Sequence, residues 1–566
     1  MACLVAKNVG GRRYWQIVTS QRVDGKPRQV VLAHLGTADA LMARLASGPG
    51  VPQKARVSEF GLLAAAWNLA TELDLAGTID RHVPKRHQGL SVGQYLLLAV
   101  LNRLSAPTSK AGMAEWYETT ALRRWLPVPA KSLSSQRFWD HMDRLDEDAI
   151  GRIEAEVTRR LVERFGIDLR CLCFDCTNFD TFIDSRTPSE LPQRGHAKSK
   201  RTDLRVVGLA LLVSIDHDIP LFWRVYPGNQ PDSVTMASVT AELVERYREL
   251  ARQTEHVTLV FDKGNNSEDN LQQLAESPYH IVGSLVPSQH SDLLAIALRK
   301  FTELQDPRLT GVTAYRTRKE VFGREWTLVV TRSQELLEGQ LRGIAQHLRK
   351  RREALDELRN RLRRSQQPGA RGKGYTLESL QEHAARLGRG QYINDILQIE
   401  VGSRRNRLYL TYRTNRAALD RLTRTVLGKR ILFTDNQDWS TEAIVLAYRS
   451  QYHVEAAFRQ MKNPHWVSWD PLHHWTDQKI RVHALYCVLA LTLAGLLQRQ
   501  AARAGLTLSG EAIHDELNSI REVLTLHASA RDDKGGRPRA YTSYVEPSAV
   551  GAKLADIFGI DRLKAR

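Results

Sequence analysis

Two short apolar runs that each end in an aspartate constrain the fold of this chain most strongly. Residues 169–174 read LRCLCF and lead to Asp175, and residues 256–261 read HVTLVF and lead to Asp262. A carboxylate at the end of a buried strand destabilises the fold unless it is paired or bound to a metal. Either aspartate alone is more simply a cap for the turn that follows. Both together, if the strands are neighbours, indicate a shared metal site.

The segments around the two runs alternate between strand and helix patterns, which predicts an α/β fold. Strands are expected where apolar and β-branched residues cluster, and helices where apolar residues recur three and four apart. Along the chain this gives three strands, a helix, a strand, a helix and a strand. The strands are expected at 168–174, 205–215, 219–228, 256–262 and 279–287, and the helices at 231–252 and 268–277.

The charge balance favours a polyanionic partner. Lys and Arg number 81 against 63 Asp and Glu, a net charge of +18. Such an excess of positive charge favours a protein that binds nucleic acid over a basic protein that has no polyanionic partner. The five scattered cysteines suit a reducing, cytoplasmic compartment. The first residues lack the apolar core of a signal peptide, and the longest apolar run, 484–497, is too short to span a bilayer. That run predicts a buried helix, and no membrane partner is expected.

A third acid, Glu455, stands on a predicted helix at 441–462. Tyr448 lies seven residues before Glu455 and Lys462 seven after, which is close to two helical turns each way. Arg459 lies one turn further along the same face. A solvated face with ordinary ion pairs gives the same spacing. The local sequence is therefore needed to decide between the two.

The string TEAIVLAYRSQYHVEAAFRQMK resembles the Tyr-Arg-Glu-Lys signature of bacterial insertion-sequence transposases of the insertion-sequence-four superfamily. That pattern is Tyr, two residues, Arg, three residues, Glu, six residues, Lys, and Tyr448, Glu455 and Lys462 fit it. Gln451 stands at the Arg position, and Arg449 or Arg459 is the expected substitute. The strings DCTNFD and VTLVFDKGNNSEDN resemble the regions of the family's two catalytic aspartates. With the later WTDQKIRVHALYCVLAL, the resemblance covers most of residues 167–500.

The resemblance implies a ribonuclease H-like core with an Asp-Asp-Glu triad, here Asp175, Asp262 and Glu455. In that fold the first and fourth strands are neighbours, so the two aspartates meet, and the Glu comes from a later helix. Two Mg²⁺ ions, replaceable by Mn²⁺, would bind the three acids and serve the cleavage and joining of DNA strands. The implied partners are double-stranded DNA, as terminal inverted repeats and as target, and a second copy of the chain in the DNA complex.

The pattern changes divide the chain into five predicted segments. A small strand-rich unit is followed by a helical DNA-binding region and the first part of the core. Because 192 residues separate Asp262 from Glu455, an insertion domain with strands and a long basic helix is expected to interrupt the core. The second part of the core then carries a helical tail. The predicted boundaries are 1–55, 56–165, 166–287, 288–438 and 439–566.

The basic helix of the insertion carries a cluster of basic residues and a leucine repeat, and each has two interpretations. Residues 341–373 hold 11 Lys or Arg and 3 Asp or Glu, which favours DNA backbone contacts at Arg349, Lys350, Arg351 and Arg352 over a merely solvated face. Leucines at 341, 348, 355 and 362 are seven apart. They suit a coiled-coil dimer seam and a helix packed within the insertion equally well.

Two clusters elsewhere have a structural interpretation that we favour. Cys171, Cys173 and Cys176 suggest zinc, but they do not share one strand face and lack a fourth ligand, so core cysteines are expected. Trp466 and Trp469 follow the signature, near His465, His473 and His474. Stacking on unpaired bases is possible there, and core packing is the commoner outcome.

Three functions compete at this point. The first is a DNA transposase, the second is a ribonuclease H-like nuclease that cuts without joining, and the third is an inactive, domesticated transposase that only binds DNA. Because all three acids and Lys462 are present, the sequence favours an active transposase.

Overall fold

The structure, a computed structural model, divides into two compact units. Unit 1 comprises Met1–Asn68, Glu115–Val128 and Glu511–Arg566, and unit 2 comprises Leu69–Ala114 and Pro129–Gly510. The residues described are 2–23, 26–40, 42, 52–84, 89–232, 234–236, 238–239, 242, 257–262, 271–272, 274, 277, 279–370, 374–527 and 538–565.

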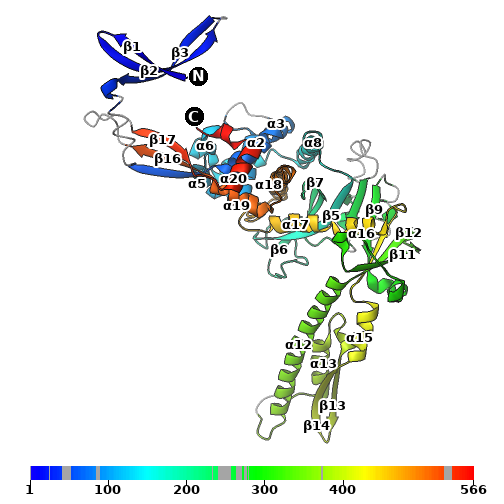
Figure 1. The fold of residues 1–566 in the computed structure, drawn as a ribbon. Coiled ribbons are helices and arrows are strands. Elements are labelled where there is room, and N and C mark those ends of the chain that lie inside the picture. Colours follow the sequence, from blue (N-terminus) through cyan, green and yellow to red (C-terminus); the bar gives the residue numbers. More distant parts are fainter. Residues whose placement is uncertain are drawn as a thin grey trace. The chain divides into compact units, whose positions relative to one another are not determined.

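Unit 2 is built on one mixed β-sheet, which has the order β10-β11-β12-β15-β9-β8-β5-β6-β7 in the described residues (Figure 1). At its centre β5 pairs antiparallel with β6 and β6 with β7, whereas β5 pairs parallel with β8 and β8 with β9. The expected adjacency of the first and fourth core strands is therefore confirmed. The five central strands are β5 (Cys171–Thr181), β6 (Arg205–Ser214), β7 (Pro220–Pro227), β8 (Val257–Phe261) and β9 (Tyr279–Leu285).

The central strands are largely buried, as is typical of core strands on which helices pack. All five residues of β8 are buried, and so are all but the first of β6. In β9, Gly283 allows a close approach: a Cβ atom there would lie 2.5 Å from the ring of Phe433. Ser284 follows directly, after the apolar residues Ile281 and Val282 and Gly283. The packing at Gly283 therefore helps to fix where Ser284 lies.

The predicted helix at 441–462 is two helices, α16 (Thr441–Arg449) and α17 (Tyr452–Met461). The chain turns at Ser450, whose hydroxyl bonds back to the Ala447 carbonyl at 2.5 Å and also contacts Cys173 Sγ at 3.2 Å. Helix α16 packs against β8, β9, β12 and β15, and α17 packs against β5 and β6. The signature segment therefore crosses the sheet over the ends of the strands that carry the two aspartates.

Other helices of unit 2 form its apolar core. Helix α4 (Val92–Ser105) is buried along nearly its whole length and packs against α18 (Asp477–Arg503). Helix α8 (Glu147–Phe165) packs on β7. In the described residues α18 alone is long and apolar enough to cross a membrane, and 94% of its most apolar window is buried inside the protein. The predicted buried helix at 484–497 is thus confirmed as part of α18.

The expected insertion domain, 288–438, was too wide. Residues at both its ends join the central sheet, because β12 and β15 are buried strands that complete the free edge of β9. The residues between β12 and β15 lie outside the sheet, and in their described part they are mainly helical rather than strand-rich. The joining strands are β10 (Thr302–Glu303), β11 (Val312–Val321), β12 (Arg324–Ser333) and β15 (Lys429–Thr434).

Residues 334–428 form an arm with a hydrophobic core of its own. The long helix α12 (Gln334–Ser365) runs alongside α13 (Leu377–Gly388) and the hairpin of β13 (Leu397–Arg404) and β14 (Arg407–Thr414) (Figure 1). The short helices α14 (Ile393–Ile396) and α15 (Arg416–Thr425) complete it. The heptad leucines of α12 pack in this core. Of the two alternatives, the helix packed within its own domain is therefore the one that forms.

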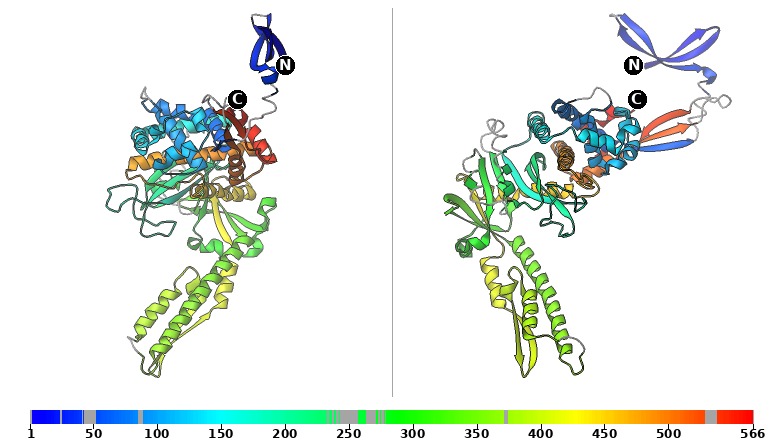
Figure 2. Two further views of the ribbon diagram at one scale, coloured as in Figure 1. Left: turned by 90° about the vertical axis from the view of Figure 1, so that its left-hand side faces the viewer. Right: turned by 180° about the vertical axis from the view of Figure 1, so that it is seen from behind.

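Unit 1 contains two small sheets. The strands β1 (Ala2–Val9), β2 (Arg12–Val23) and β3 (Lys26–Thr37), drawn in dark blue in Figure 2, form an antiparallel meander. The expected strand-rich character of this unit is therefore found. The second sheet has the order β17-β16-β4 and pairs β4 (Lys54–Glu59) with β16 (Arg521–His527) and β17 (Arg539–Tyr544).

Two predicted boundaries are corrected by this division. Segment 56–165 is not one helical region, since its residues are shared between the two units. Segment 439–566 is likewise divided, since residues from Glu511 onward belong to unit 1. Within segment 56–165, α4 is buried along nearly its whole length and therefore belongs to the core of unit 2. The predicted helices at 231–252 and 268–277 fall largely outside the described residues.

Candidate active site

Asp175 and Asp262 lie at matched positions of two neighbouring parallel strands. The register pairs Phe174 with Phe261, and each aspartate is the next residue. Parallel strands lie about 4.8 Å apart, and side chains at the same register point to the same face. The two carboxylates therefore stand side by side, although β5 continues past Asp175 to Thr181 and only Asp262 directly follows the end of its strand. Burial, with a contribution from the negative charge of Asp262, raises the pKa of Asp175.

Contacts next to both ends of helix α17 hold the helix against this face of β5. Next to its N-terminus, the Ser450 hydroxyl contacts Cys173, and beyond its C-terminus Lys462 Nζ donates a 2.7 Å hydrogen bond to Thr177 Oγ1. Cys173, Asp175 and Thr177 alternate onto one face of the strand. On the strand, Asp175 therefore lies between the bonded residues Cys173 and Thr177. On the helical segment, Glu455 likewise lies between Ser450 and Lys462.

A cavity of about 310 Å³ joins the second aspartate to the signature helices. Asp262 and Glu455 both line it, as do Tyr448, Gln451 and Arg430. The Tyr448 hydroxyl and the Ser284 hydroxyl each lie 3.0 Å from Asp262 Oδ1, and 3.0 Å from each other. Tyr448 is buried and Glu455 is exposed. The structure thus brings the predicted Glu and the second predicted Asp to one cavity.

Asp175 is a half-buried carboxylate whose charge its neighbours do not fully compensate. Burial raises its pKa from 3.8 to about 6, although Lys198 nearby and a backbone hydrogen bond favour the charged form. Lys462 is affected in the opposite direction, because burial and the neighbouring Lys198 lower its pKa below the usual value. A buried acid that ordinary neighbours do not neutralise is typical of a functional site.

The donor set fits a hard divalent cation. Three carboxylates supply the oxygen ligands that Mg²⁺ and Mn²⁺ prefer, and a cation would offset the burial of Asp175. In the part of the chain that the structure describes, no three acid, His or Cys side chains are already gathered around a single point. The aspartate pair is therefore in place, while Glu455 lies across the cavity from Asp262 on a different element.

The other predicted DNA contacts fall into two groups. Arg449 lines the cavity and donates a 2.8 Å hydrogen bond to the Arg308 carbonyl, whereas Arg459 is exposed on α17 and is not among the residues that line the cavity. On α12, Arg349 and Lys350 are exposed. Arg351 instead donates a 2.6 Å hydrogen bond to the Arg389 carbonyl inside the arm. Arg352 is exposed and donates to Thr414 Oγ1.

The cysteine cluster and the two tryptophans after the signature are buried in the core. Cys171, Cys173 and Cys176 are buried free thiols, and the described residues contain no metal-binding group that includes them. Trp469 is fully buried and stacks on Phe179 with ring centroids 4.4 Å apart, and Trp466 is buried too. The burial of these cysteines and tryptophans agrees with the expected core packing.

Sequence reasoning missed Ser284, Lys198 and Arg430. Ser284 had a signal, since it is a polar residue in an apolar strand at the level of Asp262. Arg430 had none, because it reaches the site only through the pairing of β15 with β9. Its guanidinium carbon lies 5.6 Å from the centroid of the Tyr448 ring.

Two acids at matched positions of neighbouring parallel strands in a mixed sheet suit an enzyme that uses divalent metal ions. Residues 166–493 match the model of the transposase DDE domain, and residues 5–50 match that of the IS1634 family transposase N-terminal domain. The chain therefore belongs to the DDE transposases of bacterial insertion sequences. It is a DNA transposase, an enzyme that cuts and transfers DNA strands, and nothing favours the nuclease-only or inactive alternatives.

No curated protein matches the chain. Among solved structures it is similar to the piggyBac transposase synaptic complex with hairpin DNA, at 9% sequence identity and a TM-score of 0.36, over 82% of each chain.

Proposed function

We propose that Asp175, Asp262 and Glu455 are the catalytic acids of this transposase and that they bind two Mg²⁺ ions, which Mn²⁺ can replace. The observation that carries the proposal is the matched position of Asp175 and Asp262 on neighbouring parallel strands, beside a cavity that Glu455 lines. Glu455 completes the ligand set when metal and DNA bind. The metal ions supply charge that activates the attacking oxygen and stabilises the leaving one.

The residues around the acids position them. Tyr448 and Ser284 donate to Oδ1 of Asp262 and restrict its rotation. Outer hydrogen bonds of this kind orient a metal ligand and affect metal affinity about 10- to 100-fold when lost. Lys462, fixed on Thr177 between helix and strand, places a positive charge near Asp175. The same charge suits a DNA phosphate.

One site serves both reactions, because each is the replacement of one oxygen by another at phosphorus. In cleavage, water attacks the phosphodiester, the bond to the 3′ oxygen breaks and that oxygen leaves as a 3′-hydroxyl after taking a proton. In joining, this 3′-hydroxyl loses its proton, attacks a target phosphodiester and displaces the target's own 3′ oxygen. No oxidant or other co-reactant is required.

The DNA contacts extend over several surfaces. Tyr448, Arg449, Arg459 and Lys462 lie on or beside the signature helices, and Arg349, Lys350, Arg351 and Arg352 lie on α12. The substrates are the terminal inverted repeats of the element and a target duplex. A homodimer holds the two ends in the DNA complex, and the enzyme works on the nucleoid in the bacterial cytoplasm. The net charge of +18 supports binding to a long polyanion.

A strand-transfer assay tests the proposed function. Labelled duplexes that carry an element end, taken from the inverted repeats flanking the coding sequence, are incubated with the enzyme, a circular target and Mg²⁺. We expect nicks at the repeat boundary and joined products in the target. Cleavage without joined products would instead support the nuclease. Neither product, from a folded enzyme that binds the duplex, would support the inactive form.

A further inference from the structure

Two cavities of unit 2 meet at Tyr448. The first, of about 310 Å³, contains Asp262 and Glu455. The second, of about 560 Å³, lies between β12, β15, α16 and the start of α12. Arg430, Tyr448 and Arg449 line both cavities. A nucleic acid strand that reaches the acids from the side of α12 therefore passes these three side chains.

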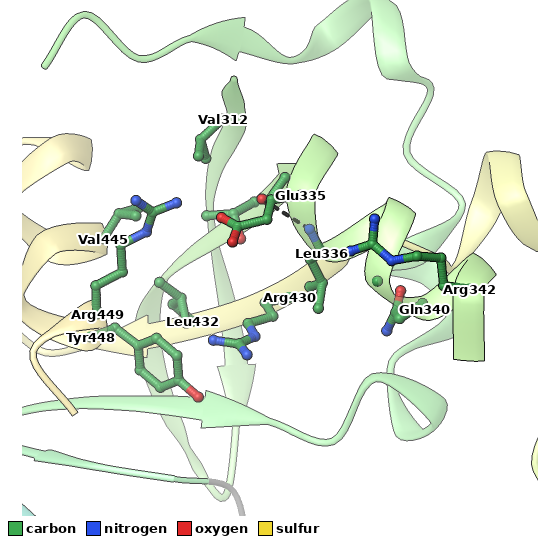
Figure 3. A pocket seen from close by; sticks show the side chains of 13 residues that line it. Val312, Glu335, Leu336, Gln340, Arg342, Arg430, Leu432, Val445, Tyr448 and Arg449 are labelled. Carbon is green, nitrogen blue, oxygen red and sulfur yellow. Dashed lines mark hydrogen bonds between the residues drawn. The ribbon is translucent and has the colours of Figure 1, made fainter. Parts of the chain in front are cut away.

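Arg430 is the cation at this junction whose donors are available. It is exposed, and in the residues that the structure describes its guanidinium makes no side-chain hydrogen bond or ion pair. The guanidinium carbon of Arg430 lies over the Tyr448 ring, 5.6 Å from the ring centroid. Figure 3 shows the guanidinium of Arg430 beside that ring. Such stacking orients a guanidinium while leaving its N–H groups at the edge of the plane.

The other arginines near the signature are placed less favourably. One nitrogen of the Arg449 guanidinium donates a 2.8 Å hydrogen bond to the Arg308 carbonyl. Figure 3 shows the Arg449 side chain extending away from the Tyr448 hydroxyl. Arg459 is exposed on α17 and lines neither cavity. Gln451, at the position where the signature has Arg, lines the cavity of Asp262 and Glu455 but carries no charge.

The cavity therefore lacks a cation at 451 and has one at 430. Two carboxylates repel a DNA phosphate, and a fixed guanidinium offsets that repulsion and can bind two phosphate oxygens at once. We propose that Arg430, supplied by β15, binds the phosphate of the DNA strand at the active site in place of an arginine at position 451. The proposal rests on the proposed function and adds a residue from outside the signature to its site.

The test exchanges the two side chains. The variant Arg430→Gln should fold as the wild type does, because the side chain is exposed, and should lower kcat/KM for cleavage of an end-containing duplex about 100-fold. Arg430→Lys keeps the charge and should recover part of the loss. The double variant Arg430→Gln/Gln451→Arg keeps composition and net charge and should recover at least tenfold over Arg430→Gln. The control is Arg170→Ala, an exposed arginine at the opposite end of β5, with unchanged cleavage.

Recovery by Lys at 430 or by Arg at 451 supports the proposal, because a merely structural role would not respond to a charge placed elsewhere in the cavity. Wild-type cleavage by Arg430→Gln, or a loss that neither variant recovers, overturns it. Glu455→Gln is assayed in parallel. If Glu455→Gln is inactive and Arg430→Gln is normal, only this inference fails, whereas normal cleavage by Glu455→Gln removes the proposed function itself.

Discussion

The hydroxyl of Tyr448 donates a 3.0 Å hydrogen bond to Oδ1 of Asp262. This bond joins the first signature residue on α16 to the acid that follows β8, and Ser284 of β9 contributes a second bond to the same oxygen. Three elements far apart in the sequence therefore fix one carboxylate. The signature tyrosine has a structural task at the acid itself, besides any contact with DNA.

Removing this hydroxyl tests that task. Tyr448→Phe keeps the ring beside Arg430 and loses both hydroxyl contacts. We expect a loss of about 1 kcal/mol in the free energy of unfolding and a 10-fold or larger loss in cleavage, because Asp262 is no longer held. Tyr409→Phe, which removes a hydroxyl bonded to Glu400 in the arm, is the control. Equal cleavage by the two variants would show that Tyr448 does not position Asp262.

The raised pKa of Asp175 predicts a stability that depends on pH and metal. Since its pKa is 3.8 in the unfolded chain and about 6 in the fold, the metal-free fold carries a penalty that is absent below about pH 4. The penalty grows up to pH 6 and is complete above it. Asp175→Asn removes it, so the variant should be more stable than wild type at pH 8 by on the order of 1–3 kcal/mol.

Urea unfolding in a chelator at pH 8 and at pH 4 measures this difference, which should vanish at the lower pH. Added Mg²⁺ should then stabilise the wild type and leave Asp175→Asn unchanged, because a ligand stabilises only the fold that binds it. Identical unfolding curves at pH 8 in the chelator would contradict the burial of an uncompensated charge at Asp175.

The basic residues of α12 should separate into two kinds. Arg349 and Lys350 are exposed, so their double reversal to Glu should weaken DNA binding, lower the salt dependence by about two phosphate contacts, and leave thermal stability unchanged. Arg351 bonds to the Arg389 carbonyl inside the arm, so Arg351→Ala should cost about 1 kcal/mol of stability. Gel-shift titrations at several salt concentrations and thermal melts measure both effects. Unchanged affinity of the folded double variant would mean that this face is only solvated.

The parts of the site that sequence predicted are those encoded locally. Asp175 and Asp262 were found because each ends an apolar run, and Glu455 because Tyr448 and Lys462 stand at fixed distances on the same segment. Ser284 was overlooked although it is polar and stands at the level of Asp262 in the neighbouring strand. Arg430 was not found, because only the pairing of β15 with β9 brings it to the acids. For the same reason the ends of the insertion were misplaced: β12 and β15 have ordinary strand patterns, which do not say which sheet they join.

The heptad on α12 shows the other limit of local patterns. Leucines seven apart fit any helix with one apolar face, whether the partner is a second chain or the same one. Here α13 and the β13–β14 hairpin cover that face. Likewise, the helical periodicity of residues 441–462 continues through Ser450, although the chain turns there to meet Cys173.

Cleavage by Glu455→Gln is the most direct test of the central claim that the three acids form the active site. The substitution keeps the size of an exposed side chain and removes its charge, so folding and DNA binding in a chelator should stay as in the wild type. Cleavage of an end-containing duplex in Mg²⁺ should fall by at least about 1,000-fold, because the site loses part of its metal charge stabilisation. A Glu455→Gln enzyme that cuts as fast as the wild type would contradict the account.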